Sequence, residues 1–178
     1  MYLTIITPCV RYGNLAAIER SINIPKENFR WIVVIDGTCI PKHLPEKCEY
    51  YLHTDENSKV GNAQRNFALN LIDDGWVYFN DDDTTLHHLL WRRIEKFEND
   101  FISFSQINKD GSLRLKGDVV KLNYIDSHNF VVKRECIGDT RWEIDKYNAD
   151  GLFAEECYKK SKNPLFIPKV LSIYNSLR

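Results

Sequence analysis

The first half of the chain alternates short apolar runs with amphipathic stretches, and this alternation limits the fold more than any other feature. Residues 31–35, Trp-Ile-Val-Val-Ile, form a continuous apolar run, as expected of a strand that is buried on both faces of a sheet. Residues 59–72 place four apolar side chains on one stripe of a helix. Strands that alternate with helices predict an α/β fold with a doubly wound, mainly parallel sheet.

The second half of the chain is less regular. Residues 109–111, Lys-Asp-Gly, predict a hairpin turn between two strands. Pro8 is expected to stop the first strand. The sequence predicts strands at residues 3–7, 31–35, 50–52, 76–79, 101–106, 113–115, 124–132 and 171–174, and helices at residues 14–22, 59–72, 86–97 and 148–160.

A length of 178 residues predicts a single compact domain over residues 1–178. The regular strand–helix pattern covers about residues 1–85, which we interpret as a nucleotide-binding half. Residues 86–178 form the less regular half. The expected sheet is therefore mixed, because the second half contains a predicted hairpin.

Composition excludes several classes of partner and compartment. The chain has 24 basic and 25 acidic residues, and a net charge of −1 gives no general attraction to nucleic acid. The cysteines are odd in number and lack a C-x-x-C pair, which argues against a disulfide framework or a structural zinc site; they are Cys9, Cys39, Cys48, Cys136 and Cys157. No signal peptide and no integral membrane segment is recognised. These features predict a cytoplasmic protein, and a peripheral place at a membrane surface stays open.

Three consecutive aspartates, Asp81, Asp82 and Asp83, follow the apolar run at residues 76–79. Two carboxylates about 4 Å apart repel each other by roughly 4 kcal/mol at an effective dielectric near 20. A turn held by a buried strand relieves that repulsion when a cation lies among the oxygens, and Mg²⁺ and Mn²⁺ prefer such ligands. The alternative is a helix N-cap, but a cap explains one aspartate and not three.

Polar residues follow three of the predicted strands, and ligands of open parallel sheets bind beyond these carboxyl ends. Thr7 and Pro8 end the first strand, and Asp36 ends the second. Asp36 is either a contact for a base or ribose or an ordinary turn residue before glycine. The start of the helix at 59–72 carries Gly61, Asn62 and Arg65, which either approach a bound diphosphate or form a solvated face.

The order of these segments resembles the GT-A-fold glycosyltransferases, especially the inverting enzymes of family 2, and one part also resembles the animal glucuronyltransferases of family 43. No glycine-rich Rossmann or P-loop motif is present. The segments that carry the resemblance are Ile5-Ile6-Thr7-Pro8, Val33-Val34-Ile35-Asp36-Gly37-Thr38, Gly61-x-x-x-Arg65-Asn66-x-Ala68 and Val77-Tyr78-Phe79-Asn80-Asp81-Asp82-Asp83.

The resemblance implies a nucleotide-sugar donor and a divalent cation, Mn²⁺ or Mg²⁺. It implies that Asp36 contacts the base, that Asp81 and Asp82 lie near the ribose and sugar, and that Asp83 binds the metal. Arg65 would face the donor phosphate or sugar. The sequence departs from the family at Ile35, where an aspartate is usual, and this weakens the assignment of a particular base.

The resemblance also implies that residues 86–178 supply the acceptor site and the catalytic base. It places a carboxylate base near the start of a late helix, where Asp150 is the candidate. A helix-cap role for Asp150 is the alternative, and Glu155 and Glu156 are rival bases. His128 is either a metal ligand, as in some GT-A enzymes, or a core or acceptor-lining residue. His87 and His88 are expected on the solvated first turn of a helix rather than at a metal.

The resemblance therefore predicts an inverting, metal-dependent glycosyltransferase that transfers a sugar from a nucleotide-sugar to a hydroxyl acceptor. A UDP-sugar is the favoured donor, because the family commonly uses one. The family's Q-x-x-R-W motif is absent, because Arg141-Trp142 lacks its glutamine, and this argues against processive synthesis. The alternatives are a sugar-phosphate nucleotidyltransferase and a non-catalytic nucleotide-sugar-binding module on the same fold.

Overall fold

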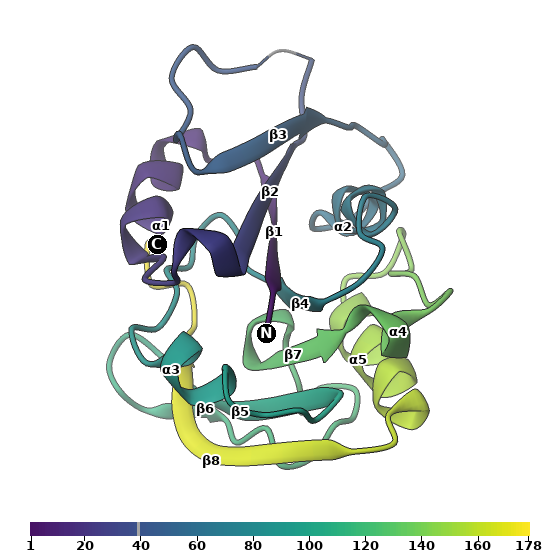
Figure 1. Ribbon diagram of the computed structural model, residues 1–178. Coiled ribbons are helices and arrows are strands. Elements are labelled where there is room, and N and C mark those ends of the chain that lie inside the picture. The colour runs from purple at the N-terminus through teal and green to yellow at the C-terminus, as the bar shows by residue number, and fades with distance from the viewer. Residues whose placement is uncertain (39) are drawn as a thin grey trace.

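The computed structural model describes residues 1–38 and 40–178, which form an eight-stranded mixed sheet with helices on both faces (Figure 1). The strand order is β3-β2-β1-β4-β7-β5-β6, and β8 pairs with β5. The first four strands in this order are parallel, whereas β7 is antiparallel to both of its neighbours. The strands are β1 (Leu3–Cys9), β2 (Phe29–Ile35), β3 (Cys48–Leu52), β4 (Trp76–Phe79), β5 (Phe101–Ile107), β6 (Leu113–Leu115), β7 (Phe130–Lys133) and β8 (Pro164–Ile173). The predicted α/β fold class is confirmed.

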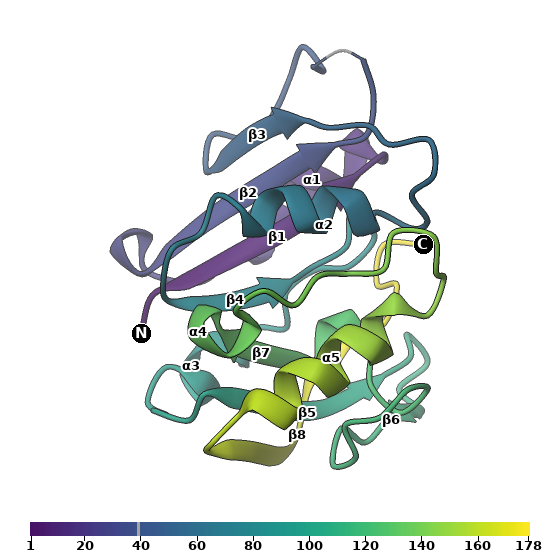
Figure 2. The same ribbon diagram turned by 90° about the vertical axis from the view of Figure 1, so that its right-hand side faces the viewer.

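Helices cover the two faces of the sheet, each over its own apolar core. Helices α1 (Leu15–Ser21) and α3 (Leu90–Ile94) lie on one face, and α2 (Asn62–Leu69), α4 (Arg134–Ile137) and α5 (Ala149–Lys160) lie on the other (Figures 1 and 2). Side chains alternate along β2, so that Val33 packs in the core beneath α1 and α3 and Val34 in the core beneath α2 and α5. No helix of the described ranges has the length and hydrophobicity needed to cross a membrane.

The first strand continues through Pro8, contrary to the expectation that Pro8 stops it. β4 pairs with β1 only as far as Ile6, and the Asn80 amide donates to the Ile6 carbonyl. Alternate residues of a strand turn their backbone N and O atoms to the same side, so the nitrogen of Pro8 points to the same side as that of Ile6. This is the side of β4, which has already ended at this level. Proline is tolerated there because no ladder hydrogen bond is lost. The longer strand carries Cys9 to the same edge as the aspartates that follow β4.

The helix predicted at residues 59–72 is shorter at both ends, because α2 begins at Asn62 and ends at Leu69. Val60 and Gly61 both have positive φ angles, 43° and 82°, which no α-helix accommodates. A Cβ on Gly61 would lie 2.6 Å from the Cβ of Pro8, so glycine is required where this turn crosses the end of β1. The turn thus fixes the start of α2 against the first strand.

The strand predicted at residues 124–132 is wrong in its first part. The three 3₁₀ helices are η1 (Tyr12–Asn14), η2 (Lys26–Asn28) and η3 (Ser127–Asn129), and η3 replaces the expected strand before β7. Asp126 caps η3, because its side chain accepts from the His128 amide while the Asn129 side chain accepts from the Asp126 amide. Local capping outweighs the strand propensity of the flanking residues here.

The cysteines that the structure describes are not joined by disulfides. Cys9, Cys48, Cys136 and Cys157 are free thiols, and Cys39 lies outside the described residues. Burial raises the pKa of the Cys157 thiol to about 12, so this thiol stays protonated at neutral pH.

Candidate active site

One cavity lies beyond the carboxyl ends of β1 and β4 and collects residues from both halves of the chain. Ten of the predicted site residues line it, namely Pro8, Asp36, Gly61, Asn62, Arg65, Asp81, Asp82, Asp83, His128 and Asp150. Thr7 does not line the cavity. It is fully buried, and its hydroxyl accepts a hydrogen bond from the Trp31 indole at 3.0 Å. Thr7 therefore supports the sheet beneath the cavity rather than its wall.

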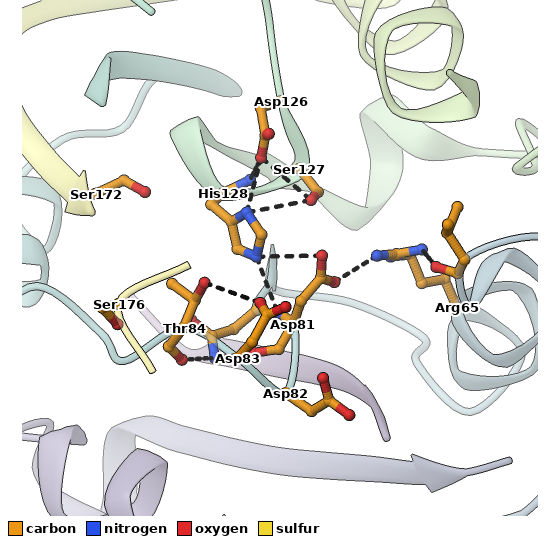
Figure 3. A network of polar contacts seen from close by, with 12 residues as sticks. Arg65, Asp81, Asp82, Asp83, Thr84, Asp126, Ser127, His128, Ser172 and Ser176 are labelled. Carbon is orange, nitrogen blue, oxygen red and sulfur yellow. Dashed lines mark hydrogen bonds and ion pairs between the residues drawn. The ribbon is translucent and has the colours of Figure 1, made fainter. Parts of the chain in front are cut away.

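Asp81 forms an ion pair with Arg65, whose side chain is almost fully buried (Figure 3). Arg65 also donates to the Val60 carbonyl at 2.8 Å and stacks 4.5 Å above the Trp142 ring. These contacts fix the guanidinium beside the cavity, and its Nε has no protein partner among the described residues. A preorganised arginine of this kind suits an anionic ligand.

The Asp82 carboxylate holds the loop that follows β1. Its Oδ2 accepts from the amides of Val10 and Arg11, each at 2.7 Å, and its Oδ1 pairs with the Arg11 guanidinium. The Asn14 side chain donates to the Asp82 carbonyl at 2.9 Å. With these partners, Asp82 anchors the loop in the folded chain, although it also lines the cavity as expected.

The Asp83 carboxylate is buried and faces two guanidinium groups. The Arg178 Nε lies 2.6 Å from Asp83 Oδ2, and an Arg11 nitrogen lies 3.3 Å from the same oxygen. The Asp83 carbonyl accepts from the Leu177 amide at 2.8 Å. The repulsion expected among the three aspartates is therefore balanced by arginines: Arg65 pairs with Asp81, Arg11 with both Asp82 and Asp83, and Arg178 with Asp83.

His128 lies between two carboxylates (Figure 3). Its Nδ1 is 2.7 Å from Asp126 Oδ1, and its Nε2 accepts from the Asp81 amide at 3.0 Å. Burial lowers the pKa of His128, but the carboxylates of Asp81 and Asp126 outweigh burial and raise the pKa to about 9. The Asp81 amide acts in the opposite sense, because an N–H that donates to Nε2 stabilises the neutral ring.

These residues fit a divalent cation that arrives with a phosphate-bearing ligand. Asp126 accepts from the Nδ1–H of His128, as carboxylates do beside metal-binding histidines, but the Asp81 amide occupies the Nε2 lone pair, so His128 would bind a metal only after that hydrogen bond breaks. Asp83 adds hard oxygen donors. Over residues 1–38 and 40–178, no three His, Cys, Asp or Glu side chains could hold a metal by themselves. Phosphate oxygens are the usual source of the remaining ligands for Mg²⁺.

Asp150 lines the same cavity from the first turn of α5. Within the described residues, the Asp150 carboxylate accepts a hydrogen bond from the Gly151 amide at 2.8 Å. Burial raises the pKa of Asp150 to about 6, with the Asp126 carboxylate acting in the same direction. The rivals lie outside the cavity wall: Glu155 accepts from the Leu122 amide, and Glu156 pairs with Lys159. Of these three carboxylates, Asp150 is the one that lines the cavity.

Asn62 and Asp36 reach the cavity in different ways. The Asn62 side chain donates to the carbonyls of Glu143 and Lys146 at 2.9 and 2.8 Å, so it fastens the segment that leads to Asp150. Asp36 is half-buried at the end of β2, and its amide donates to the Cys9 carbonyl at 3.0 Å. His87 and His88 lie before α3, with ring centroids 4.5 Å apart, and neither lines the cavity.

Several cavity residues carry no signal in the sequence. Arg114 donates to Asp126 at 2.8 Å and stacks 3.7 Å above the Tyr174 ring. Tyr147 stands at the cavity with 80% of its surface exposed. Arg178 reaches Asp83 from the end of the described chain. Tyr147 and Arg178 come from irregular segments, and Arg114 comes from the three-residue strand β6, which is too short for periodicity to show where its side chains point.

The fold matches solved glycosyltransferase structures. No protein-family model and no curated protein sequence matches the chain. S. aureus TarS residues 1–349, solved with UDP, aligns over 97% of this chain at 16% identity and a TM-score of 0.77. The same protein with UDP-GlcNAc gives 0.75 at 16% identity and 97% coverage.

A mannosyltransferase from Pyrobaculum calidifontis, solved with GDP-Man and Mn²⁺, aligns over 97% of the chain at 13% identity and a TM-score of 0.71. The chain spans 56–60% of the length of these structures. At such low identity the comparison concerns the fold, and it confirms the GT-A fold that the sequence motifs indicated.

Proposed function

We propose that the chain is a divalent-cation-dependent, inverting glycosyltransferase that transfers a sugar from a nucleotide-sugar, with UDP as the favoured nucleotide, to a hydroxyl of a saccharide or other acceptor. The observation that carries the proposal is the meeting of Asp83, His128 and Asp150 at one cavity beyond the parallel strands. The similar structures support it, since they hold UDP, UDP-GlcNAc, or GDP-Man with Mn²⁺. We propose a non-processive reaction, because the chain lacks the Q-x-x-R-W motif.

The proposed chemistry is a single displacement. Asp150 accepts the proton of the acceptor hydroxyl as that oxygen forms a bond to the anomeric carbon of the donor. The bond from this carbon to the diphosphate oxygen breaks, and the nucleoside diphosphate leaves with the electron pair. Asp83 and His128 would hold Mn²⁺ or Mg²⁺, and the cation would supply positive charge against the leaving diphosphate. Arg65, held by Asp81, adds a fixed positive charge beside it.

The loop after β1 disfavours a sugar-phosphate nucleotidyltransferase. Such an enzyme needs free backbone amides or basic side chains in this loop to bind a triphosphate. Here the amides of Val10 and Arg11 both donate to Asp82. The position of Asp150 on the cavity wall favours an enzyme over a non-catalytic binding module, which needs no base there. Transfer or donor hydrolysis across a panel of sugar nucleotides tests this second point directly.

Asp83→Asn is expected to abolish the stabilisation by nucleotide plus metal. UDP or GDP with Mn²⁺ at about 100 times its Kd should stabilise the wild-type protein by about 2.7 kcal/mol, seen as a rise in Tm. The variant loses an anionic metal ligand and should show no Mn²⁺-dependent shift. Asp73→Asn, at an exposed carboxylate, is the matched control. A normal Mn²⁺-dependent shift in Asp83→Asn would remove Asp83 from the metal site.

The pH dependence of transfer is expected to report the ionisation of Asp150. A base must be deprotonated, and burial raises the pKa of Asp150 to about 6. The rate should therefore rise about tenfold per pH unit below pH 6 and become constant above about pH 7. Nucleotide and Mn²⁺ binding, followed over the same range, separates this effect from ligand titration. A rate that is constant from pH 5 to 8 would contradict the assignment.

A further inference from the structure

A single oxygen of Asp83 carries two positive partners. Oδ2 lies 2.6 Å from Arg178 Nε and 3.3 Å from an Arg11 nitrogen, while the Asp83 side chain is only 4% exposed. The Arg178 side chain is 54% exposed and lines the cavity. The pair therefore joins a buried carboxylate to a guanidinium that is also open to solvent and to the cavity.

Backbone contacts hold the end of the chain at the cavity without help from the Arg178 side chain. We call residues 174–178 the C-terminal strap. The Tyr174 amide donates to the Ile107 carbonyl, and the Leu177 amide donates to the Asp83 carbonyl, each at 2.8 Å. Ser176 Oγ accepts from the Thr85 amide at 2.8 Å. The Arg178 side chain can therefore turn while the strap stays in place.

The two arginines differ in their freedom to leave Asp83. The Arg11 amide and guanidinium both bind Asp82, and the neighbouring Val10 amide does so too, which fixes Arg11 from three directions. Arg178 makes its side-chain ion pair with Asp83. Arg178 is the partner that can be exchanged.

A divalent cation and the Arg178 guanidinium compete for the same carboxylate. A cation bound at Asp83 would lie within a few ångströms of the guanidinium, and like charges at that distance repel strongly in a buried site. The diphosphate of a donor, in contrast, offers oxygens that a guanidinium binds in a bidentate manner. These oxygens would lie beside the cation and thus within reach of a side chain anchored at residue 178.

We propose that Arg178 exchanges partners during donor binding: it holds Asp83 in the absence of cation, and it binds the donor diphosphate once the cation takes that carboxylate. The proposal rests on the proposed function. It assigns to Arg178 a donor-binding role and makes the strap a part of the active site. It also explains why a buried carboxylate is paired with a half-exposed arginine from a distant segment.

Two titrations with opposite expected signs test the exchange in Arg178→Gln. With Mn²⁺ alone, followed by the EPR signal of the free ion, the variant should bind at least about threefold more tightly than wild type, because no ion pair has to break. With UDP at saturating Mn²⁺, followed by calorimetry, it should bind at least about tenfold more weakly, as expected for a lost charge-assisted contact. Arg92→Gln, exposed on α3, should change neither affinity.

Arg178→Lys separates charge from anchoring, because it keeps a cation beside Asp83 and should bind Mn²⁺ alone as wild type does. Equal tightening in Arg178→Lys would assign the effect to a loosened strap and overturn the proposal. An unchanged Mn²⁺ affinity, or an unchanged UDP affinity, in Arg178→Gln would also overturn it. A wild-type protein that binds neither UDP nor GDP would instead refute the proposed function, while the Mn²⁺ titration would still report on the Arg178–Asp83 pair.

Discussion

Asp150→Asn is expected to lower the rate of sugar transfer by about 10²–10⁴-fold and, at the same time, to make the folded protein more stable at neutral pH. The loss of activity follows from the loss of the base. The asparagine oxygen still accepts from the Gly151 amide, so the start of α5 should keep its conformation. Donor binding, measured by calorimetry with UDP and Mn²⁺, should change little.

The gain in stability follows from the raised pKa. Asp150 has a pKa near 3.8 in the unfolded chain and about 6 in the folded protein, so the folded state binds more protons between these values. Stability is therefore lost as the pH rises from about 4 to about 6, and the loss above pH 6 is about 3 kcal/mol for two pKa units. Asparagine carries no charge and avoids this cost.

Urea unfolding of both proteins at pH 4 and pH 7.5 measures the effect. The variant should be more stable at pH 7.5, and the difference should shrink toward pH 4, where the wild-type carboxyl is protonated in the fold. The cap role that the sequence left open for Asp150 is wrong, because Asn148 is the N-cap residue of α5; a variant that is less stable than wild type at pH 7.5 would show that the Asp150 carboxylate nevertheless stabilises the first turn. Equal activity of the two proteins would remove Asp150 as the base.

The parts of the fold that the sequence predicted are those in which local pattern and tertiary burial agree. The strand at residues 76–79 has the predicted bounds, because its four residues are apolar and all four are buried. The helix at residues 59–72 was predicted too long, because periodicity cannot show that Val60 and Gly61 take positive φ angles. The strand at residues 124–132 failed because Asp126 caps a turn, a contact between side chain and backbone that apolar alternation does not reveal.

The candidate site was predictable where it depends on topology. Parallel strands bring their carboxyl ends together, and so Asp36 and the aspartates after β4 were expected at one edge. The charge balance was not predictable, since Arg178 lies 95 residues beyond Asp83 in sequence and neither residue belongs to a regular element. The carboxylate repulsion inferred from the sequence is balanced in the structure by Arg11, Arg65 and Arg178.

Asp126→Ala is expected to destabilise the protein by about 3–5 kcal/mol and to weaken Mn²⁺ binding in the presence of UDP by about 10–100-fold. Asp126 is buried and accepts from the His128 amide, from His128 Nδ1 and from Arg114. Its removal leaves the His128 amide, the His128 ring and the Arg114 guanidinium without this acceptor, and it frees the His128 ring to turn away from Asp81. Asp118→Ala, which breaks an exposed pair with Lys116, should cost less than about 1 kcal/mol.

Acid unfolding distinguishes this role of Asp126 from simple packing. Burial raises the pKa of Asp126, but His128 and Arg114 outweigh burial and hold it below its ordinary value of 3.8. The folded state thus binds fewer protons than the unfolded state, and the stabilisation that is present above about pH 4 is lost as the pH falls further. Asp126→Ala should lack this part of the acid transition. If its stability falls with acid as steeply as that of wild type, the carboxylate is not what ties η3 and His128 to the site.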